Sequence, residues 1–420
     1  MDLLPTTLGT RPRLAVELRP EGVVAARAED TQALLSAVAY GVFAEGALLP
    51  GLKAGNVVAH AEMVLAVRKA LEAVAEKERQ TTLVVPDAAV RVLLLDFDQL
   101  PAKAAEALPI VRFRLKKLLP FDADEAAVSY QVMSSSRGLV RVLAVAVPKD
   151  VLREYEAVIR EAGFEPGAVM PSTLAACAGL PEIEIAALVV NAGETAVTTA
   201  IVQGGVLLLH RTVDLIAEGP GERGMVVAGV NESPGEPKVA SDGRMPSDPR
   251  MLALVERESS AGEWARQEPL NGYGVVEDDR IGAEAGMQAL RTEQELRAEY
   301  ADATLSEQEE RIGREAMLPP LPSVQKIDEQ RLVAAAREVT QAVSVAAAYF
   351  EDTLQMAPGM VLAAGTLGAE ALGTLLREAG YVQSEMRVRE MVEPEMLTGG
   401  AVSSRVPRGW MAGVRGALRS

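Results

Sequence analysis

The chain contains 420 residues, of which 49% are hydrophobic, and its net charge is −17. A chain of this length can bury at least two hydrophobic cores, and its negative charge argues against nucleic acid as a primary partner. It has no apolar run of about eighteen residues and no signal-peptide core in residues 1–12, so we expect a cytoplasmic protein that does not span the membrane. The single cysteine, Cys177, excludes an intramolecular disulfide, and its apolar surroundings indicate a small buried hydrophobe.

Strands and helices alternate over the first 180 residues. The apolar periodicity predicts strands at 14–18, 23–27, 81–86, 91–97, 128–133 and 140–147, and helices at 60–77, at 149–162 and from Ser172. A mixed basic and apolar segment over 110–119 precedes the turn Pro120-Phe121-Asp122. This segment fits a solvated helix face, and it would also suit contact with anionic lipid or an acidic partner.

The second half repeats the same theme around an interruption. Strands are predicted at 186–191, 195–202, 206–211 and 360–364, and helices at 332–352 and 368–379. Two copies of a strand–strand–strand–helix pattern, with long helices between them, predict two related α/β lobes around a cleft. This is the architecture of actin and the sugar kinases.

The interruption, residues 218–329, is strongly acidic. It contains 24 acidic and 12 basic residues, many turn-forming residues and weak apolar periodicity. Such a composition buries too little apolar surface to offset its ordering entropy, so we expect a largely disordered insertion with transient helices. It serves either as a linker or as an element that recruits a partner.

Several sequence features resemble one family of bacterial actin-like proteins. They are Leu119-Pro120-Phe121, the run Ser129-Tyr130-Gln131-Val132, the run Val145-Ala-Val-Pro-Lys149 followed by Tyr155, and the stretch REAGFEPGAVMPSTLAACAGL at 160–180. Together they resemble the type IV pilus assembly protein PilM family over about half of the chain. The resemblance implies an actin-like, ribonuclease H-like fold with two lobes and a small inserted subdomain.

The resemblance also implies a domain layout. The first lobe would span residues 1–180 and include the inserted subdomain at about 101–147. The second lobe would combine residues 181–217 with 330–400. The acidic insertion, 218–329, would interrupt it, and residues 401–420 would form a basic tail with four arginines around Trp410. We expect that tail to dock on a membrane surface or a partner, or to fray.

The resemblance implies a scaffold role at the cytoplasmic side of the inner membrane. PilM-type proteins bind the cytoplasmic N-terminal peptide of the membrane protein PilN and link it to the pilus motor platform. A groove that accepts an extended peptide is therefore expected, in the inserted subdomain and at the edge of the first lobe. Two alternatives stay open: an active actin-like ATPase or sugar kinase, and a relative of the cytoplasmic domain of a type II secretion component.

In this family three turns would hold ATP with magnesium, and here each departs from the family pattern. The first turn, with Glu17 and Gly22, lacks the preceding glycines and contains Pro20, which has no backbone N–H. The second turn, with Asn191, Gly193 and Thr195, has Asn in place of the family's Asp and carries a negative charge at Glu194. The third turn, with Gly365 and Thr366, keeps only one of the family's glycines. We therefore expect a degenerate nucleotide site and no ATPase activity, with residual ATP binding as the alternative.

No other catalytic constellation is evident. The chain has only two histidines, His60 and His210, which is too few for a His-based metal site or a catalytic triad. His210 lies near the end of a predicted strand, and we expect it at the surface or at a hinge.

Overall fold

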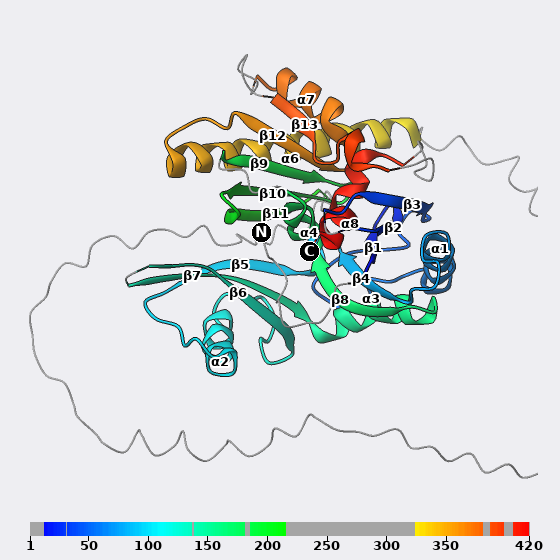
Figure 1. Ribbon diagram of the computed structural model, residues 1–420. Helices are drawn as coiled ribbons and strands as arrows, with labels where there is room; N and C mark the ends of the chain where they lie inside the picture. The colour runs from blue at the N-terminus through cyan, green and yellow to red at the C-terminus, as the bar shows by residue number, and fades with distance from the viewer. Residues whose placement is uncertain are drawn as a thin grey trace, which may run out of the picture. The chain divides into compact units, whose positions relative to one another are not determined.

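The structure, a computed structural model, describes residues 12–30, 32–136, 138–180, 185–215, 324–380, 387–398 and 406–419. Within them lie two five-stranded sheets and one three-stranded sheet, each with its own helices (Figure 1). The acidic insertion lies outside the described residues as far as residue 323, so its predicted disorder stays a prediction.

The first lobe is built on a mixed sheet with the strand order β3-β2-β1-β4-β8. Its strands are β1 (Leu14–Arg19), β2 (Gly22–Ala28), β3 (Leu35–Val42), β4 (Gln80–Val85) and β8 (Glu165–Pro171). The first three pair antiparallel, and β1, β4 and β8 run parallel. Helices α1 (His60–Glu72) and α3 (Lys149–Glu161) cover one face and form a hydrophobic core with it.

The second lobe repeats this arrangement with the order β11-β10-β9-β12-β13. Its strands are β9 (Ala187–Ala192), β10 (Ala196–Gln203), β11 (Val206–Asp214), β12 (Met360–Gly365) and β13 (Arg387–Glu390). Helices α6 (Val324–Leu354) and α7 (Gly368–Glu378) cover its outer face. The matching strand orders confirm the two related α/β lobes predicted from the sequence.

A three-stranded antiparallel sheet forms the inserted subdomain. Its order is β5-β7-β6, from β5 (Arg91–Phe97), β7 (Leu139–Pro148) and β6 (Ala126–Ser136), and helix α2 (Ala104–Leu115) packs on it. A short 3-10 turn, η1 (Asp87–Ala89), joins β4 to β5. The sheet therefore takes in residues 91–97, which lie before the subdomain boundary expected at about residue 101.

Helices α4 (Ser172–Ala178) and α8 (Met411–Leu418) lie where the two lobes meet. They share one hydrophobic core with the inner faces of both five-stranded sheets (Figure 1). Their backbones approach so closely that a side chain on Gly416 would place its Cβ 1.8 Å from the carbonyl oxygen of Ala175. Glycine at this position therefore sets the spacing between the two helices.

The prediction of an exposed or docking tail is wrong for residues 406–419. Every residue of α8 is buried, and the guanidinium groups of Arg415 and Arg419 donate hydrogen bonds to the carbonyl of Gly179 at 2.8 and 3.1 Å. Gly179 ends α4, so these arginines satisfy a carbonyl group that the helix leaves free. Two of the four arginines thus attach the C-terminal segment to the end of α4.

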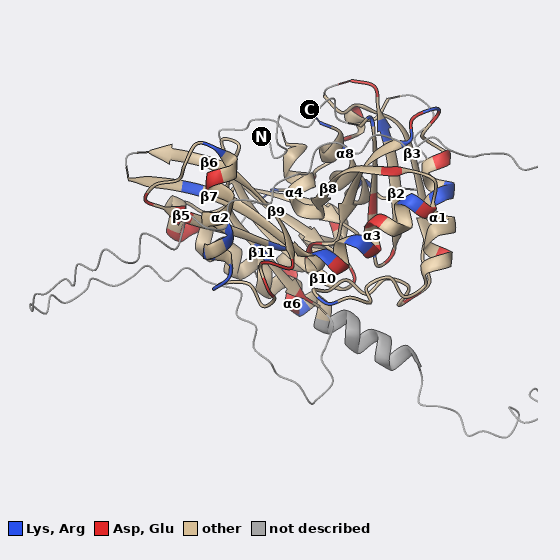
Figure 2. Ribbon diagram, turned by 90° about the horizontal axis from the view of Figure 1, so that it is seen from below, with Lys and Arg blue, Asp and Glu red and all other residues tan. Residues whose placement is uncertain are grey.

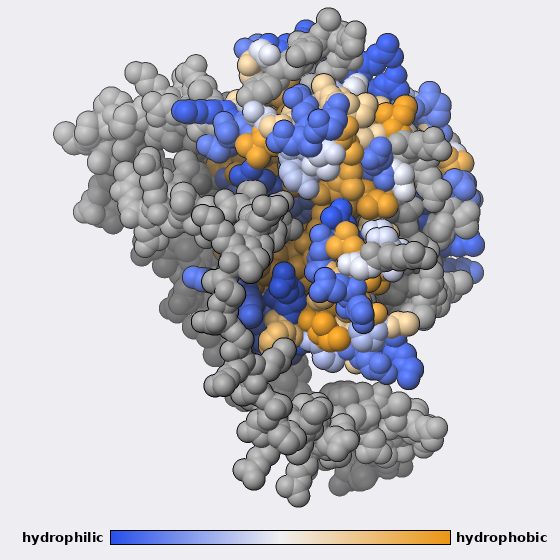
Figure 3. Space-filling view, turned by 90° about the vertical axis from the view of Figure 1, so that its left-hand side faces the viewer, coloured by the Kyte–Doolittle hydropathy of each residue, from blue (hydrophilic) through white to orange (hydrophobic). Residues whose placement is uncertain are grey.

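Charged and exposed apolar side chains are distributed unevenly. The outer faces of α1 and α3 carry residues of both signs (Figure 2). Near the β6–β7 turn Val132 and Leu139 are 45% and 40% exposed, and on α2 Phe113 is 66% exposed. Hydrophobic residues also lie between hydrophilic ones on the face shown in Figure 3. Among the described helices, none has the length and apolar character needed to cross a membrane.

Candidate functional site

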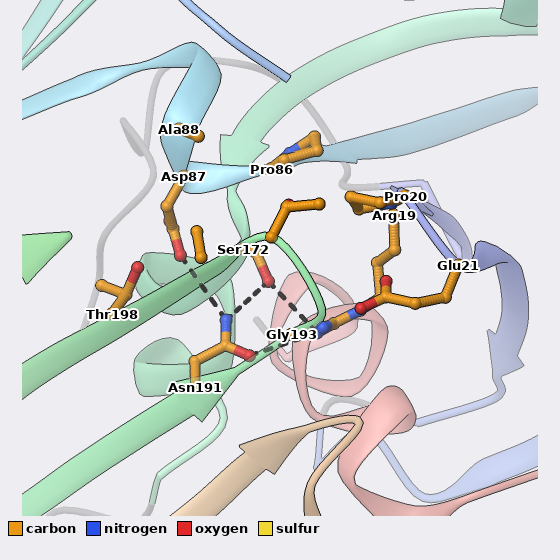
Figure 4. A pocket seen from close by; sticks show the side chains of 12 residues that line it. Arg19, Pro20, Glu21, Pro86, Asp87, Ala88, Ser172, Asn191, Gly193 and Thr198 are labelled. Carbon is orange, nitrogen blue, oxygen red and sulfur yellow. Dashed lines mark hydrogen bonds between the residues drawn. The ribbon is translucent and has the colours of Figure 1, made fainter. Parts of the chain in front are cut away.

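A small polar cavity lies between the two lobes where the β1–β2 turn faces the β9–β10 turn (Figure 4). Its volume is about 40 Å³. We call it the interlobe cavity; it is lined by Arg19, Pro20, Glu21, Pro86, Asp87, Ala88, Ser172, Asn191, Gly193, Thr195, Ala196 and Thr198. This volume corresponds to a few water molecules, whereas ligand pockets commonly measure about 300–1,000 Å³.

Strand alternation explains why two predicted site residues point between the lobes. In β1 the side chains of Leu14, Val16 and Leu18 join the outer core of the first lobe, so Glu17 faces the second lobe. In β9, Leu188 and Val190 join the outer core of the second lobe, so Asn191 faces the first. Successive side chains of a strand point to opposite faces of the sheet, and on both central strands this alternation directs one polar side chain to the inner face. The carboxylate of Glu17 and the amide of Asn191 therefore both point between the lobes.

Arg19 joins these two residues. Its Nη2 atom lies 2.7 Å from Oε1 of Glu17 and donates to Oγ of Ser172 at 3.3 Å and to Oδ1 of Asn191 at 3.5 Å. Ser172 in turn donates to Glu17 at 2.6 Å. It also accepts from Nδ2 of Asn191 at 2.9 Å (Figure 4). One buried guanidinium thus contacts oxygen atoms from β1, α4 and β9.

Asp87 extends the same network along the first turn of α4. Its carboxylate accepts hydrogen bonds from the hydroxyl of Thr173 at 2.5 Å and from the Thr173 backbone N–H at 3.1 Å. Nδ2 of Asn191 donates to Oγ1 of Thr173 at 3.0 Å and to Asp87 at 3.5 Å. Asn191 therefore bonds residues of the first lobe through both ends of its amide.

The two turns also meet directly. The backbone N–H of Glu194 donates to Oε1 of Glu21 at 2.6 Å, and a Cβ on Gly193 would lie 3.1 Å from the same oxygen. In an anion-binding turn such an N–H would be available to a phosphate oxygen. Here a carboxylate of the chain itself takes the position of the anion.

The third predicted turn closes behind Asn191. Gly365 has φ of +85°, and a Cβ there would lie 2.2 Å from the carbonyl oxygen of Ala192. The N–H of Thr366 donates to that same carbonyl at 2.8 Å. Gly409 packs against the other side of Gly365, where a Cβ would lie 2.2 Å from the Gly365 carbonyl oxygen. The turn is thus packed between β9 and the C-terminal segment.

Burial shifts the pKa values of Glu17 and His210 in opposite directions. Burial raises the pKa of Glu17, although the charge of Arg19 and the hydrogen bond from Ser172 oppose the shift. Burial also lowers the pKa of His210, while the charge of Asp87 acts in the opposite direction. His210 is 4% exposed and its Nε2 atom lies 4.0 Å from Oδ1 of Asp87. Of the two positions expected for His210, the surface or a hinge, the surface is therefore wrong.

The residues present do not fit ATP with magnesium. Glu21 and Asp87 line the cavity, with Glu17 beside it, where phosphate oxygens would need donors and positive charge. Among the described residues that line the cavity the one cation is Arg19, which is already paired with Glu17, and the Glu194 N–H is already bonded to Glu21. Among the described residues no cluster of three or more His, Cys, Asp or Glu side chains could hold a metal ion.

The structure brings together most of the site residues predicted from the sequence. Asn191, Gly193 and Thr195 line the cavity, Glu17 contacts it through Arg19 and Ser172, and Gly365 packs against Asn191. Two lie elsewhere: Gly22 pairs with Val42 of β3, and Thr366 bonds to Ala192.

Sequence reasoning missed Arg19, Glu21, Asp87, Ser172 and His210. The signal that could have found them is a charged residue in or directly after a predicted buried strand, as with Arg19 and Glu21 in the first turn and Asp87 after residues 81–86.

A second concavity, which we call the groove, lies between the first lobe and the inserted subdomain. It has a volume of about 170 Å³ and is lined by Val85, Ala89, Val90, Ala127, Val128, Ser129, Val145, Val147, Leu152, Tyr155, Val169, Met170 and Pro171. Of these side chains only Ser129 and Tyr155 carry an oxygen atom, and the Tyr155 hydroxyl donates to Asn56 at 3.1 Å. The groove is thus an apolar channel beside the edge strands β6 and β8.

Removal of the Arg19 charge should strongly destabilise the fold. We expect Arg19→Met to lower the free energy of unfolding by about 3–5 kcal/mol, because it leaves the carboxylate of Glu17 buried without its counter-ion. The double variant Glu17→Gln/Arg19→Met removes both charges and should recover most of that loss. Urea unfolding followed by circular dichroism measures the free energy of unfolding of both variants. Equal losses in the single and double variants would contradict the pairing.

His210 should make the protein less stable in mild acid. Because its pKa is lowered in the folded state, the unfolded chain takes up a proton near pH 6.5 while the folded chain does not. The free energy of unfolding therefore falls as the pH drops from about 7.5 to 5.5, by at most about 1.4 kcal/mol over this range. His210→Gln should flatten this dependence in urea unfolding at several pH values. Parallel curves for the two proteins would show that His210 does not carry the effect.

The comparisons with known proteins agree with this geometry at the level of the fold. No protein-family model matches the chain, and no curated protein matches it. Among solved structures, the PilM–PilN type IV pilus biogenesis complex matches with a TM-score of 0.57 and 15% identity, over 97% of this chain and 98% of that one.

Two other structures are less similar. The cytoplasmic domain of EpsL, an inner-membrane component of the type II secretion system of Vibrio cholerae, has 17% identity and a TM-score of 0.32, over 48% of this chain and 71% of that one. The ethanolamine utilization protein EutJ from Carboxydothermus hydrogenoformans has 11% identity and a TM-score of 0.37, over 98% of this chain and 91% of that one. The chain thus has a PilM-like, actin-like fold: two lobes with a small inserted subdomain.

Proposed function

We propose that this protein is a scaffold of type IV pilus assembly that binds a cytoplasmic peptide of a PilN-like inner-membrane protein and does not turn over ATP. The observation that carries the proposal is the apolar groove between the first lobe and the inserted subdomain, on a fold shared with a PilM–PilN complex. Through this peptide the protein would be held at the cytoplasmic face of the inner membrane and would link it to the motor platform.

The form of the groove supports an extended peptide as its ligand. Both strands at its rims are edge strands: β6 ends the order β5-β7-β6, and β8 ends the order of the first lobe's sheet. Edge strands recognise peptides by adding a strand, in which main-chain bonds give affinity and pockets select alternate side chains. The apolar lining would receive aliphatic side chains of such a peptide. The volume of about 170 Å³ suits a few side chains better than a drug-sized molecule.

The interlobe cavity supports the absence of ATP turnover. Arg19 takes the place of an external cation and donates to Asn191 of the facing strand, and Glu21 takes the place of an external anion at the Glu194 N–H. The turns that would bind nucleotide therefore bind each other. A nucleotide would have to break these contacts and place phosphates beside buried carboxylates. The function proposed here therefore depends on binding and not on a chemical step.

A substitution at the mouth of the groove should abolish peptide binding. Ser129→Trp would fill the groove from an exposed position, so we expect at least a tenfold loss of affinity for a labelled peptide of about ten residues from the N-terminus of the PilN-like protein of the same organism. Fluorescence anisotropy measures this, with a wild-type dissociation constant in the micromolar range. Ser135→Trp, an exposed position on the same strand but outside the groove, is the matched control. Equal effects of the two variants would contradict the groove assignment.

ATP with magnesium should give no measurable heat in isothermal titration, and phosphate release should stay at the background rate. The reason is that Arg19 and Glu21 already occupy the cation and anion positions of the facing turns. The same protein sample must bind the peptide, which shows that it is folded. A micromolar dissociation constant for ATP would overturn the assignment of a degenerate site.

A further inference from the structure

The groove and the interlobe cavity share two walls. In the segment 85–90, Val85, Ala89 and Val90 line the groove, whereas the three residues between them, Pro86–Ala88, line the cavity. At the start of α4 the same division occurs, since Met170 and Pro171 line the groove and Ser172 lines the cavity. A displacement of either segment therefore changes both concavities.

One residue of the second lobe is bonded to both walls. Nδ2 of Asn191 donates to Ser172 at 2.9 Å, to Thr173 at 3.0 Å and to Asp87 at 3.5 Å. Asp87 belongs to the first wall, and Ser172 belongs to the second. Asn191 is 6% exposed, so water does not compete for these bonds as it would at the surface.

The amide at position 191 suits this role better than a carboxylate would. An aspartate could not donate to Asp87 or Ser172, and it would place a second negative charge within about 3.5 Å of Asp87. The asparagine donates through Nδ2 and accepts from Arg19 through Oδ1. The residue type is thus matched to the Asp87 and Arg19 that face it.

We infer that Asn191 is a positioning residue for the groove: from the second lobe it holds the turn 85–90 and the start of α4 in place, so that peptide binding in the first lobe and contact between the lobes strengthen each other. This inference rests on the proposed function for the identity of the peptide, but its structural part concerns the two walls alone. Because coupling between two equilibria is reciprocal, the peptide must also stabilise the bonds of Asn191.

The test compares wild type, Asn191→Asp and Asn191→Leu with the matched control Thr198→Val. Thr198 lines the same cavity from the same lobe, but its hydroxyl bonds Thr212 of its own lobe at 3.0 Å. We expect the two Asn191 variants to bind the labelled N-terminal peptide at least fivefold more weakly, while Thr198→Val stays within about twofold of wild type. Thermal melts identify any variant that does not fold.

Hydrogen exchange gives a readout that needs no peptide. In the Asn191 variants, amides of residues 87–90 and 172–174 should exchange faster than in wild type and in Thr198→Val. If neither Asn191 variant folds, the wild-type protein alone still tests the positioning role. Saturating peptide should then slow amide exchange in residues 191–196 of the second lobe, and unchanged exchange there would overturn the role.

The outcomes separate the two proposals. If wild type does not bind the peptide, the proposed function fails, and ligand-free exchange in the Asn191 variants then decides the positioning role. If wild type binds and Asn191→Asp binds equally well, or if exchange in the two walls is unchanged, the positioning role is overturned while the proposed function stands.

Discussion

The guanidinium of Arg19 is the contact on which the meeting of the two lobes depends. It faces a carboxylate from β1, a hydroxyl from α4 and an amide oxygen from β9, and its partner Glu17 is fully buried. Burial of such a pair costs desolvation energy, which is offset only when the remaining polar atoms are bonded. Arginine suits this position because its planar group presents several donors in fixed directions. Ser172 bonds Glu17, Arg19 and Asn191 at once, whereas Oε2 of Glu17 and Nε of Arg19 are buried without a hydrogen-bond partner among the described residues, so the offset is incomplete.

Small residues on α4 and α8 make this contact geometrically possible. A Cβ on Gly413 would lie 2.2 Å from Oε2 of Glu17, and one on Gly416 would lie 1.8 Å from the carbonyl of Ala175. Larger side chains there would push α8 away from β1 and α4 and open the shared core to water. The polar network and the close helix packing therefore depend on each other. The network determines which side chains face each other between the lobes, and the helix packing determines the distance between them.

The sequence predicted the repeated lobes well because strand alternation and helical periodicity are local properties. It missed β3, β8 and β13; β8 contains Pro166, Gly167 and Pro171, which are typical of turns, and its place depends on parallel pairing with β4. Helix α8 was taken for part of a tail because the four arginines of residues 401–420 make that segment look solvated, whereas Arg415 is buried and donates to the carbonyl of Gly179. At the site, the turn positions followed from residue types. The bonds of Arg19 to Ser172 and of Asp87 to Thr173 did not, since these partners lie 153 and 86 residues away in the sequence.

The internal cation and anion change what controls lobe contact. In a fold that closes around a bound ligand, closure depends on ligand concentration, because only differential binding shifts the equilibrium. Arg19 and Glu21 are covalently part of the chain, so their effective concentration at the turns is fixed. Under the proposed function, contact between the lobes therefore does not depend on bound nucleotide. The groove shares its walls with this contact, and its volume of about 170 Å³ leaves room for side chains of an external partner. Under the proposed function, the partner peptide takes over the regulatory position that nucleotide holds in a ligand-gated version of the fold.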